Sequence, residues 1–235
     1  VVVHVFYPSS GRDLAEFRRI CREDVEHLLV GDLLRRLSPG DFILVDGSLL
    51  GRMLHVARSL GISGYEDFIY DYLNRYRKLL ERVLEKDVII VGVSKDSRTT
   101  LLRKTILLDI LSKYVSSIPQ EFADDILGIV ERYWFSHREF LDGLSLLRRK
   151  YSLSDELYGF LREFADPTPD VKILGMLRLN PGYSRPIYVR VAGGRWLVMD
   201  LNSDSQHNFP PLVSFYVLFR EGDIPMRVDI VCKEV

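Results

Sequence analysis

The sequence has few of the features that mark membrane, secreted or metal-thiolate proteins. It contains no run of 18 or more apolar residues, so we expect no membrane-spanning helix. Its two cysteines, Cys21 and Cys232, lie far apart without metal-ligand spacing, which suits a reducing cytoplasm. The opening residues, 1–5, are already strand-like, so we expect no secretory signal.

The net charge is close to zero, and the familiar catalytic motifs are absent from the sequence. The formal net charge is −1, so a nucleic acid would have to be bound by a local basic patch. The sequence has no glycine-rich phosphate loop before a helix, no paired-histidine zinc motif and no serine nucleophile elbow. Arginine outnumbers lysine by 24 to 8, and its guanidinium suits phosphate recognition and surface ion pairs equally well.

One stretch stands out among the residues that are present. The apolar run Phe42 to Val45 leads directly into Asp46 and Gly47. Such a run predicts a buried strand, flanked on both faces, and the glycine allows a sharp turn where the strand ends. A carboxylate at the carboxyl end of a buried strand suits a metal ligand or an acid/base group, although a plain turn would have the same sequence.

The remaining pattern predicts an α/β protein with a mixed sheet. Alternation of strand-like and helical segments favours a parallel crossover early in the chain, and hairpin signals favour antiparallel strands near its end. We expect helical breaks near Pro119 and Gly143 and a linker at 166–170. The predicted strands are 1–7, 42–45, 87–93, 186–191, 196–201, 212–219 and 226–232, and the predicted helical segments are 13–37, 65–86 and 99–165.

Polar residues follow two of these strands. Asp46 ends one strand and Lys95 follows the next, so parallel pairing would place both at the same edge of the sheet. The preceding helix carries Glu23 and Glu26, which could face that edge. Carboxylates around one cavity need a cation, and oxygen ligands favour Mg²⁺ or Mn²⁺, which activate water for attack on a phosphodiester. A solvated helix face and a surface lysine are the simpler alternatives.

Several segments resemble the NurA family of DNA nucleases, and the likeness covers nearly the whole chain. The segments are 45–49, 91–97, 177–186, 196–200, 215–217 and 224–229. The resemblance implies a ribonuclease H-like mixed sheet flanked by helices, in a single nuclease domain over 1–235 with a helical insertion at about 99–165. It also implies a manganese-dependent enzyme, or one that uses magnesium, that degrades DNA from the 5′ end and nicks single strands. The family works as a homodimer with the hexameric HerA ATPase in processing double-strand breaks.

The resemblance also assigns roles to residues. Asp46 matches the acidic residue of the family's central Asp-Gly motif, and Glu26, with Glu23 as the alternate, matches the helix glutamate that is another metal ligand. Lys95 matches the lysine after the later strand, so we count it with Asp46 and Glu26 as catalytic. Lys95, Arg98 and Arg185 are our candidates for contacting DNA phosphates.

Two parts of the family pattern have no counterpart in this sequence. The family's first aspartate lies on an earlier strand, and its closing tyrosine and histidine precede a final helix. We therefore expect a chain trimmed at its ends, or a divergent member of the family. One alternative of a different class is a non-catalytic scaffold that docks on a translocating ATPase and guides DNA. A weaker one is an RNA-directed or transposase-like member of the same fold class.

Overall fold

The computed structural model describes most of the chain as two compact units, and each unit is described here by itself. The first unit combines Val1–Lys95, Gly182–Val217 and Met226–Val235, and the second combines Asp96–Pro181 and Leu218–Pro225. The strand expected at 1–7 and the hairpin arm expected at 196–201 lie outside the described residues. The described ranges are 11–53, 66–95, 97–114, 118–133, 137–177, 179–189 and 209–233.

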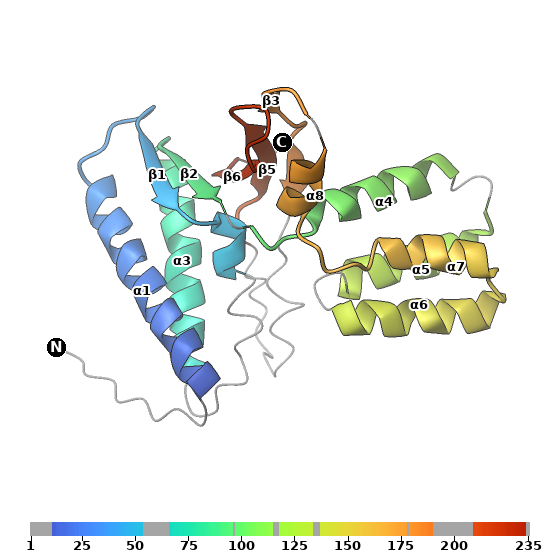
Figure 1. Cartoon of the computed structure of the whole chain (residues 1–235). Coiled ribbons are helices and arrows are strands. Elements are labelled where there is room, and N and C mark those ends of the chain that lie inside the picture. The colour runs from blue at the N-terminus through green and yellow to red at the C-terminus, as the bar shows by residue number, and fades with distance from the viewer. Residues whose placement is uncertain are drawn as a thin grey trace. The chain divides into compact units, whose positions relative to one another are not determined.

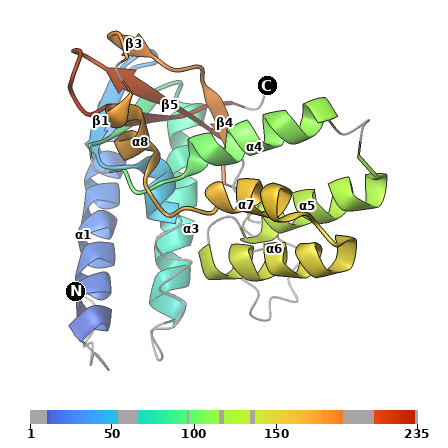
Figure 2. The ribbon, with the colours of Figure 1, turned by 45° about the vertical axis from the view of Figure 1, so that its right-hand side comes forward.

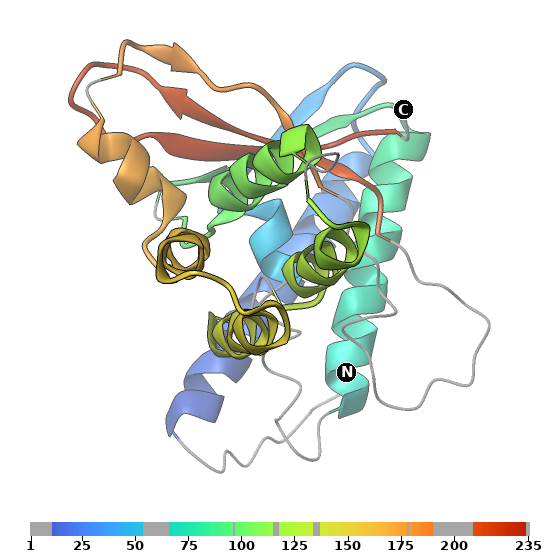
Figure 3. The same cartoon turned by 90° about the vertical axis from the view of Figure 1, so that its right-hand side faces the viewer.

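A mixed sheet forms the centre of the first unit. Its strand order is β1-β2-β6-β5-β3, and β4 pairs with β5. Strands β1 and β2 run parallel, as expected, and β2–β6, β5–β6 and β4–β5 are antiparallel. The antiparallel pair β5 and β6 is the red pair of arrows in Figure 3. The strands are β1 (Phe42–Asp46), β2 (Ile89–Ser94), β3 (Gly182–Tyr183), β4 (Ile187–Val189), β5 (Leu212–Leu218) and β6 (Met226–Val231).

Two long helices, α1 (Gly11–Leu34) and α3 (Glu66–Glu85), flank this sheet (Figure 1). They pack against each other, and α3 also contacts β2. The hydrophobic core between the helices is formed by Ile20, Ile69 and Tyr72. The apolar stripe of α3 is thereby removed from water, which is the main stabilising effect available to an amphipathic helix, whereas α1 leaves Val25, Leu28 and Leu29 more than half exposed.

The expectation that the first described strand is covered on both faces is wrong. Side chains of β1 alternate, with Ile43 and Val45 buried while Phe42 is 71% and Leu44 66% exposed. Among the described strands β1 is at the edge of the sheet, and the described residues cover only one of its faces. A short apolar run has the same sequence pattern whether one face or both faces of the strand are covered, so only the packing distinguishes the two cases.

The described residues of the second unit are mostly helical within 99–165, as expected, and α5 begins directly after Pro119 (Figure 2). The break expected near Gly143 is wrong, because this residue lies inside α6. A Cβ there would lie 3.0 Å from Ile129 of α5, so the glycine allows the two helices to approach closely. The helices are α4 (Leu101–Tyr114), α5 (Gln120–Tyr133), α6 (His137–Tyr151), α7 (Asp155–Glu163) and α8 (Asp170–Met176).

The segment expected to be a linker contains the start of α8. Its Asp170 is fully buried, and its carboxylate accepts a hydrogen bond of 2.8 Å from the backbone N–H of Leu102. This contact satisfies a donor in the first turn of α4, as a capping residue does. Asp170 is therefore a structural residue of the helical unit.

The chain is thus a mixed α/β protein whose mainly antiparallel sheet is flanked by helices, as expected. The ribonuclease H-like detail and the single domain with an insertion at 99–165 stay predictions. Within the described ranges, none of the helices combines the length and the apolar character that a membrane-spanning segment needs.

Candidate active site

The carboxyl end of β1 presents Asp46 to solvent. Asp46 is exposed and pairs in register with Val93 of β2. Gly47 then adopts a φ of +100°, which favours glycine, and its N–H donates a hydrogen bond of 2.8 Å to the carbonyl of Val93. The turn after the strand is therefore tied to β2, and the Asp46 side chain lies on the open face that also carries Phe42 and Leu44.

The acidic stretch of α1 divides into residues with separate roles. Asp24 receives two hydrogen bonds from Arg75, of 3.0 and 2.8 Å, which tie α1 to α3. Glu23 is buried, and the hydroxyl of Tyr72 donates to it at 2.8 Å. Burial raises the pKa of the Glu23 carboxyl above its ordinary value. Glu26 is more open, with 39% of its side chain exposed.

A buried arginine joins Glu26 to the end of β1. Arg52 is 4% exposed, and its Nη2 atom donates to Glu26 Oε2 at 2.5 Å and to the backbone carbonyl of Asp46 at 3.1 Å. Arg22 also approaches Glu26, at 3.8 Å. Arg52 therefore links Glu26 to the main chain at the end of β1, whereas the Asp46 side chain lies on the open face of the strand, so a shared role of the two carboxylates stays a prediction.

Next to this arginine lies a buried histidine that the sequence left unremarked. His27 stacks on Tyr76 with ring centroids 4.3 Å apart, and neither ring nitrogen has a hydrogen-bond partner among the described residues. Burial, together with the positive charges of Arg52 and Arg75, lowers the pKa of His27 to about 3. The imidazole is therefore neutral at physiological pH and is part of the core.

The three basic candidates are all exposed. Lys95 comes directly after β2. Because β2 is parallel to β1, Lys95 lies at the same end of the sheet as Asp46. Arg185 lies between β3 and β4. Arg98 belongs to the helical unit, whose placement relative to the sheet is not defined. Of the three, Lys95 is the one that the fold brings to the edge carrying Asp46.

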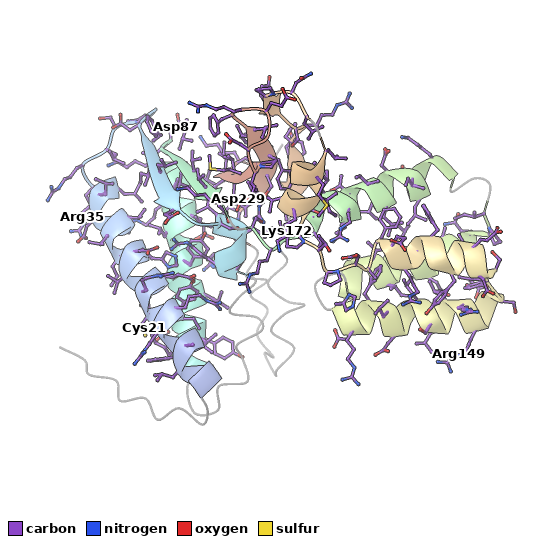
Figure 4. The ribbon with its side chains drawn as sticks, in the orientation of Figure 1. Cys21, Arg35, Asp87, Arg149, Lys172 and Asp229 are labelled. Carbon is purple, nitrogen blue, oxygen red and sulfur yellow. The ribbon has the colours of Figure 1, made fainter. Side chains whose placement is uncertain are left out.

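Sequence reasoning missed a buried ion pair on β6. Arg227 and Asp229 are 2% and 0% exposed, and the guanidinium donates to both carboxylate oxygens, at 2.8 and 2.7 Å. Figure 4 labels Asp229 among the side chains of the first unit. Ser48 and Ser214 donate to the same carboxylate, each at 2.7 Å. Burial alone would raise the pKa of Asp229, but Arg227 and the two hydroxyl groups together hold it below its usual range. The only signal in the sequence was an Arg-x-Asp pattern in a strand of alternating character.

Comparison with known proteins identifies the family. A family model described as the NurA domain matches residues 1–233. The chain belongs to the NurA family. It is also similar to a solved structure, "Crystal structure of the NurA nuclease from Sulfolobus solfataricus", with 17% sequence identity and a TM-score of 0.45. That match covers 100% of this chain and 56% of the other, so the chain spans little more than half of that protein's length. A comparison with curated proteins finds no match.

The family assignment confirms the resemblance seen in the sequence. Segments that carried it are far apart in the chain, yet several of them fall on neighbouring strands. The NurA-like segments 45–49, 91–97, 224–229 and 215–217 contain parts of β1, β2, β6 and β5, which is their order in the sheet. The NurA-like segments therefore lie side by side on four neighbouring strands of the sheet.

The residues of this NurA domain fit a metal only in part. Asp46 and Glu26 supply carboxylate oxygens, which suit Mg²⁺ or Mn²⁺. Glu26 is, however, already bound by Arg52. Within the described part of the chain, no group of three or more His, Cys, Asp or Glu residues is placed to hold a metal ion. The two carboxylates are therefore an incomplete set of ligands.

Proposed function

We propose that this NurA domain is part of a metal-dependent DNA nuclease, and that Asp46 and Glu26 supply two of the metal ligands. The observation that carries the proposal is the position of Arg52 Nη2, within hydrogen-bond distance of both the Glu26 carboxylate and the Asp46 carbonyl. An acidic helix residue and an acidic strand end are thus neighbours although 20 positions separate them in the sequence.

The proposed roles follow from charge and exposure. Asp46, exposed at the strand end, is the proposed ligand from the sheet, and Glu26, with 39% of its side chain exposed, is the proposed ligand from α1. A bound Mn²⁺ or Mg²⁺ supplies Lewis acidity toward a phosphoryl oxygen and a more acidic water. Lys95, at the same end of the sheet as Asp46, neutralises a phosphate of the substrate, and Arg185 of the same unit contacts the DNA backbone. Arg98, in the helical unit, is a further candidate for a phosphate contact.

The finer activities are those that the family resemblance implies. They are degradation from the 5′ end and nicking of single strands, in the processing of double-strand breaks in the cytoplasm with a hexameric HerA ATPase. The two free cysteines are compatible with a reducing compartment. The open apolar face of β1, with Phe42 and Leu44 exposed, supports a homodimer, since a patch of this kind is usually covered by a partner.

A nuclease assay with matched variants tests the proposal. Labelled DNA is incubated with Mn²⁺ or Mg²⁺ and with wild type, Asp46→Ala or Asp41→Ala. Asp41 is the matched control, because it is also an exposed carboxylate and lies at the opposite end of β1. We expect Asp46→Ala to reduce the rate about 100-fold or more, since a metal contributes several kcal/mol to the transition state. Asp41→Ala should stay within about twofold, and equal rates for all three proteins would remove Asp46 from the mechanism.

The scaffold alternative is favoured by a specific observation. Glu26 is already neutralised by Arg52 and approached by Arg22, and the described residues form no complete metal site. A domain of this kind could guide DNA beside an ATPase without cutting it. If wild type shows no metal-dependent cleavage but binds DNA, and Lys95→Ala weakens that binding, the scaffold function is the correct one. A binding competition between DNA and RNA distinguishes the RNA-directed alternative, for which RNA should compete better than DNA.

A further inference from the structure

The turn that follows Asp46 is anchored to the opposite end of the sequence. Ser48 Oγ donates to Asp229 Oδ2 at 2.7 Å, and it accepts from Arg227 Nη2 at 2.6 Å. The backbone N–H of Leu50 donates to the same carboxylate oxygen at 3.2 Å. Gly51 N–H in turn donates to Ser48 Oγ at 2.7 Å. One buried ion pair on β6 therefore holds the turn through both a side chain and the backbone.

This ion pair is suited to act as a rigid anchor. Both residues are almost completely buried, and the Asp229 carboxylate accepts hydrogen bonds from Arg227, Ser48, Ser214 and the Leu50 N–H. A buried ion pair stays charged when its groups are hydrogen-bonded on all sides, as they are here. Such a network has one low-energy arrangement, so the turn bound to it has one position.

A glycine on β2, Gly92, allows the same turn to pack closely against the sheet. A Cβ at Gly92 would lie 2.7 Å from Leu49 Cγ, 2.8 Å from the Gly47 carbonyl oxygen and 3.0 Å from the Leu49 nitrogen. The backbone of the turn therefore rests directly on β2, in space that any side chain would occupy. Gly92 and Asp229 are register partners on neighbouring strands, so the turn packs on the glycine and is hydrogen-bonded to the ion pair beside it.

We propose that Arg227 and Asp229 are positioning residues, which hold the turn 47–50 and thereby set the place of the Asp46 carboxylate. The inference rests on the proposed function, in which that carboxylate binds a metal. A metal ligand has to be held within a fraction of an ångström, and the groups behind it provide this precision. Asp46 needs such support because it is exposed at the end of an edge strand and is followed by a glycine.

Two serine variants test the inference. Ser48→Ala and Ser214→Ala each remove one hydroxyl that donates to Asp229 at 2.7 Å, but only Ser48 belongs to the turn. Because Ser48 Oγ also accepts from Gly51 N–H and Arg227 Nη2, urea unfolding should show a larger loss of stability for Ser48→Ala than for Ser214→Ala, and cleavage is compared under conditions in which both variants are fully folded. We expect Ser48→Ala to raise the Mn²⁺ concentration for half-maximal cleavage about tenfold or more, as loss of a group behind a metal ligand does, while Ser214→Ala stays within about twofold. The same Mn²⁺ dependence in both variants would overturn the inference.

A double-mutant cycle distinguishes positioning from direct contact of Ser48 with substrate. If Ser48 acts through the ion pair, Ser48→Ala has little further effect in the background of Asp229→Asn. If the full effect of Ser48→Ala persists in that background, Ser48 acts by itself and the inference is wrong. Should Asp229→Asn fail to fold, Arg227→Lys provides the background instead.

Hydrogen exchange separates failure of this inference from failure of the proposed function. If wild type does not cleave DNA, the nuclease proposal fails, but the anchoring of the turn can still be measured. Amides of 49–52 should exchange about tenfold faster in Ser48→Ala than in Ser214→Ala. Asp46→Ala, in contrast, should leave these amides protected while abolishing any cleavage. Equal protection of the turn in both serine variants would overturn the inference whether or not the protein is a nuclease.

Discussion

We predict that acid destabilises the first unit through His27. The ring is 6% exposed, stacks on Tyr76, and lacks a hydrogen-bond partner among the described residues for either nitrogen. Protonation would place a positive charge beside Arg52 and Arg75, in a site that offers it no acceptor. Burial and these two charges lower the pKa of His27 to about 3.

The magnitude follows from linkage between protonation and folding. A histidine of the unfolded chain has a pKa of about 6.5, so the unfolded state binds a proton that the folded state refuses. The stabilising contribution is therefore present above pH 6.5 and is lost as the pH falls toward 3. Between pH 7.5 and pH 5 the loss is about 2 kcal/mol, and it is about 3 kcal/mol by pH 4. The loss of about 2 kcal/mol between pH 7.5 and pH 5 changes little for any folded-state pKa of His27 below about 4.

Urea unfolding of wild type and His27→Phe at pH 7.5, 6 and 5 measures this effect. Phenylalanine keeps an aromatic ring against Tyr76 and cannot be protonated. Glu23 lies close by, and since burial raises its pKa, its contribution has the opposite sign, but it is present in both proteins. We expect wild type to lose about 2 kcal/mol more than the variant between pH 7.5 and pH 5. Parallel pH profiles for the two proteins would show that His27 is not the acid-sensitive group.

Two further pairs of variants test the packing around the site. Gly92→Ala should lower the free energy of unfolding by about 1–3 kcal/mol, because its Cβ would lie 2.7 Å from an atom of the turn 47–49. Gly128→Ala in α5 has open space around it and should instead raise stability by about 0.5–1 kcal/mol, so equal effects in urea unfolding would contradict the steric argument. Tyr72→Phe removes a donor to a buried carboxylate and should cost about 1.5–3 kcal/mol at pH 7. Tyr76→Phe removes a 3.0 Å bond to a backbone carbonyl and should cost about 1 kcal/mol, and the reverse order would refute this ranking.

The elements predicted best from the sequence were those with local signals. The helix expected at 65–86 is α3, and the strand expected at 212–219 is β5, because an apolar period or an alternation over many residues is a local property. The predictions that failed depended on contacts. Gly143 was expected to break a helix, but its role is decided by Ile129 on a neighbouring helix, which no local pattern reveals.

The candidate site was predictable in part for the same reason. Asp46 follows a strong strand signal. The parallel order of β1 and β2 places Lys95, which follows β2, at the same end of the sheet as Asp46. The partners that hold the site come from far along the chain. Ser48 and Asp229 are 181 positions apart, and neither the spacing nor the residue types could indicate that they meet. The sequence likewise offered no signal for Arg52, which lies between the two predicted ligands.

The choice between Glu23 and Glu26, which the sequence left open, can be argued from what each carboxylate contacts. Glu23 is 6% exposed and accepts a hydrogen bond from the Tyr72 hydroxyl, and its burial disfavours the charged form and raises the pKa of the carboxyl. A divalent cation would need to enter that core and displace its donor. Glu26 is open on one side, and its partner Arg52 also contacts the main chain of Asp46. A cation arriving from solvent can therefore reach Glu26 by displacing one guanidinium, which is why we propose Glu26 rather than Glu23 as the ligand.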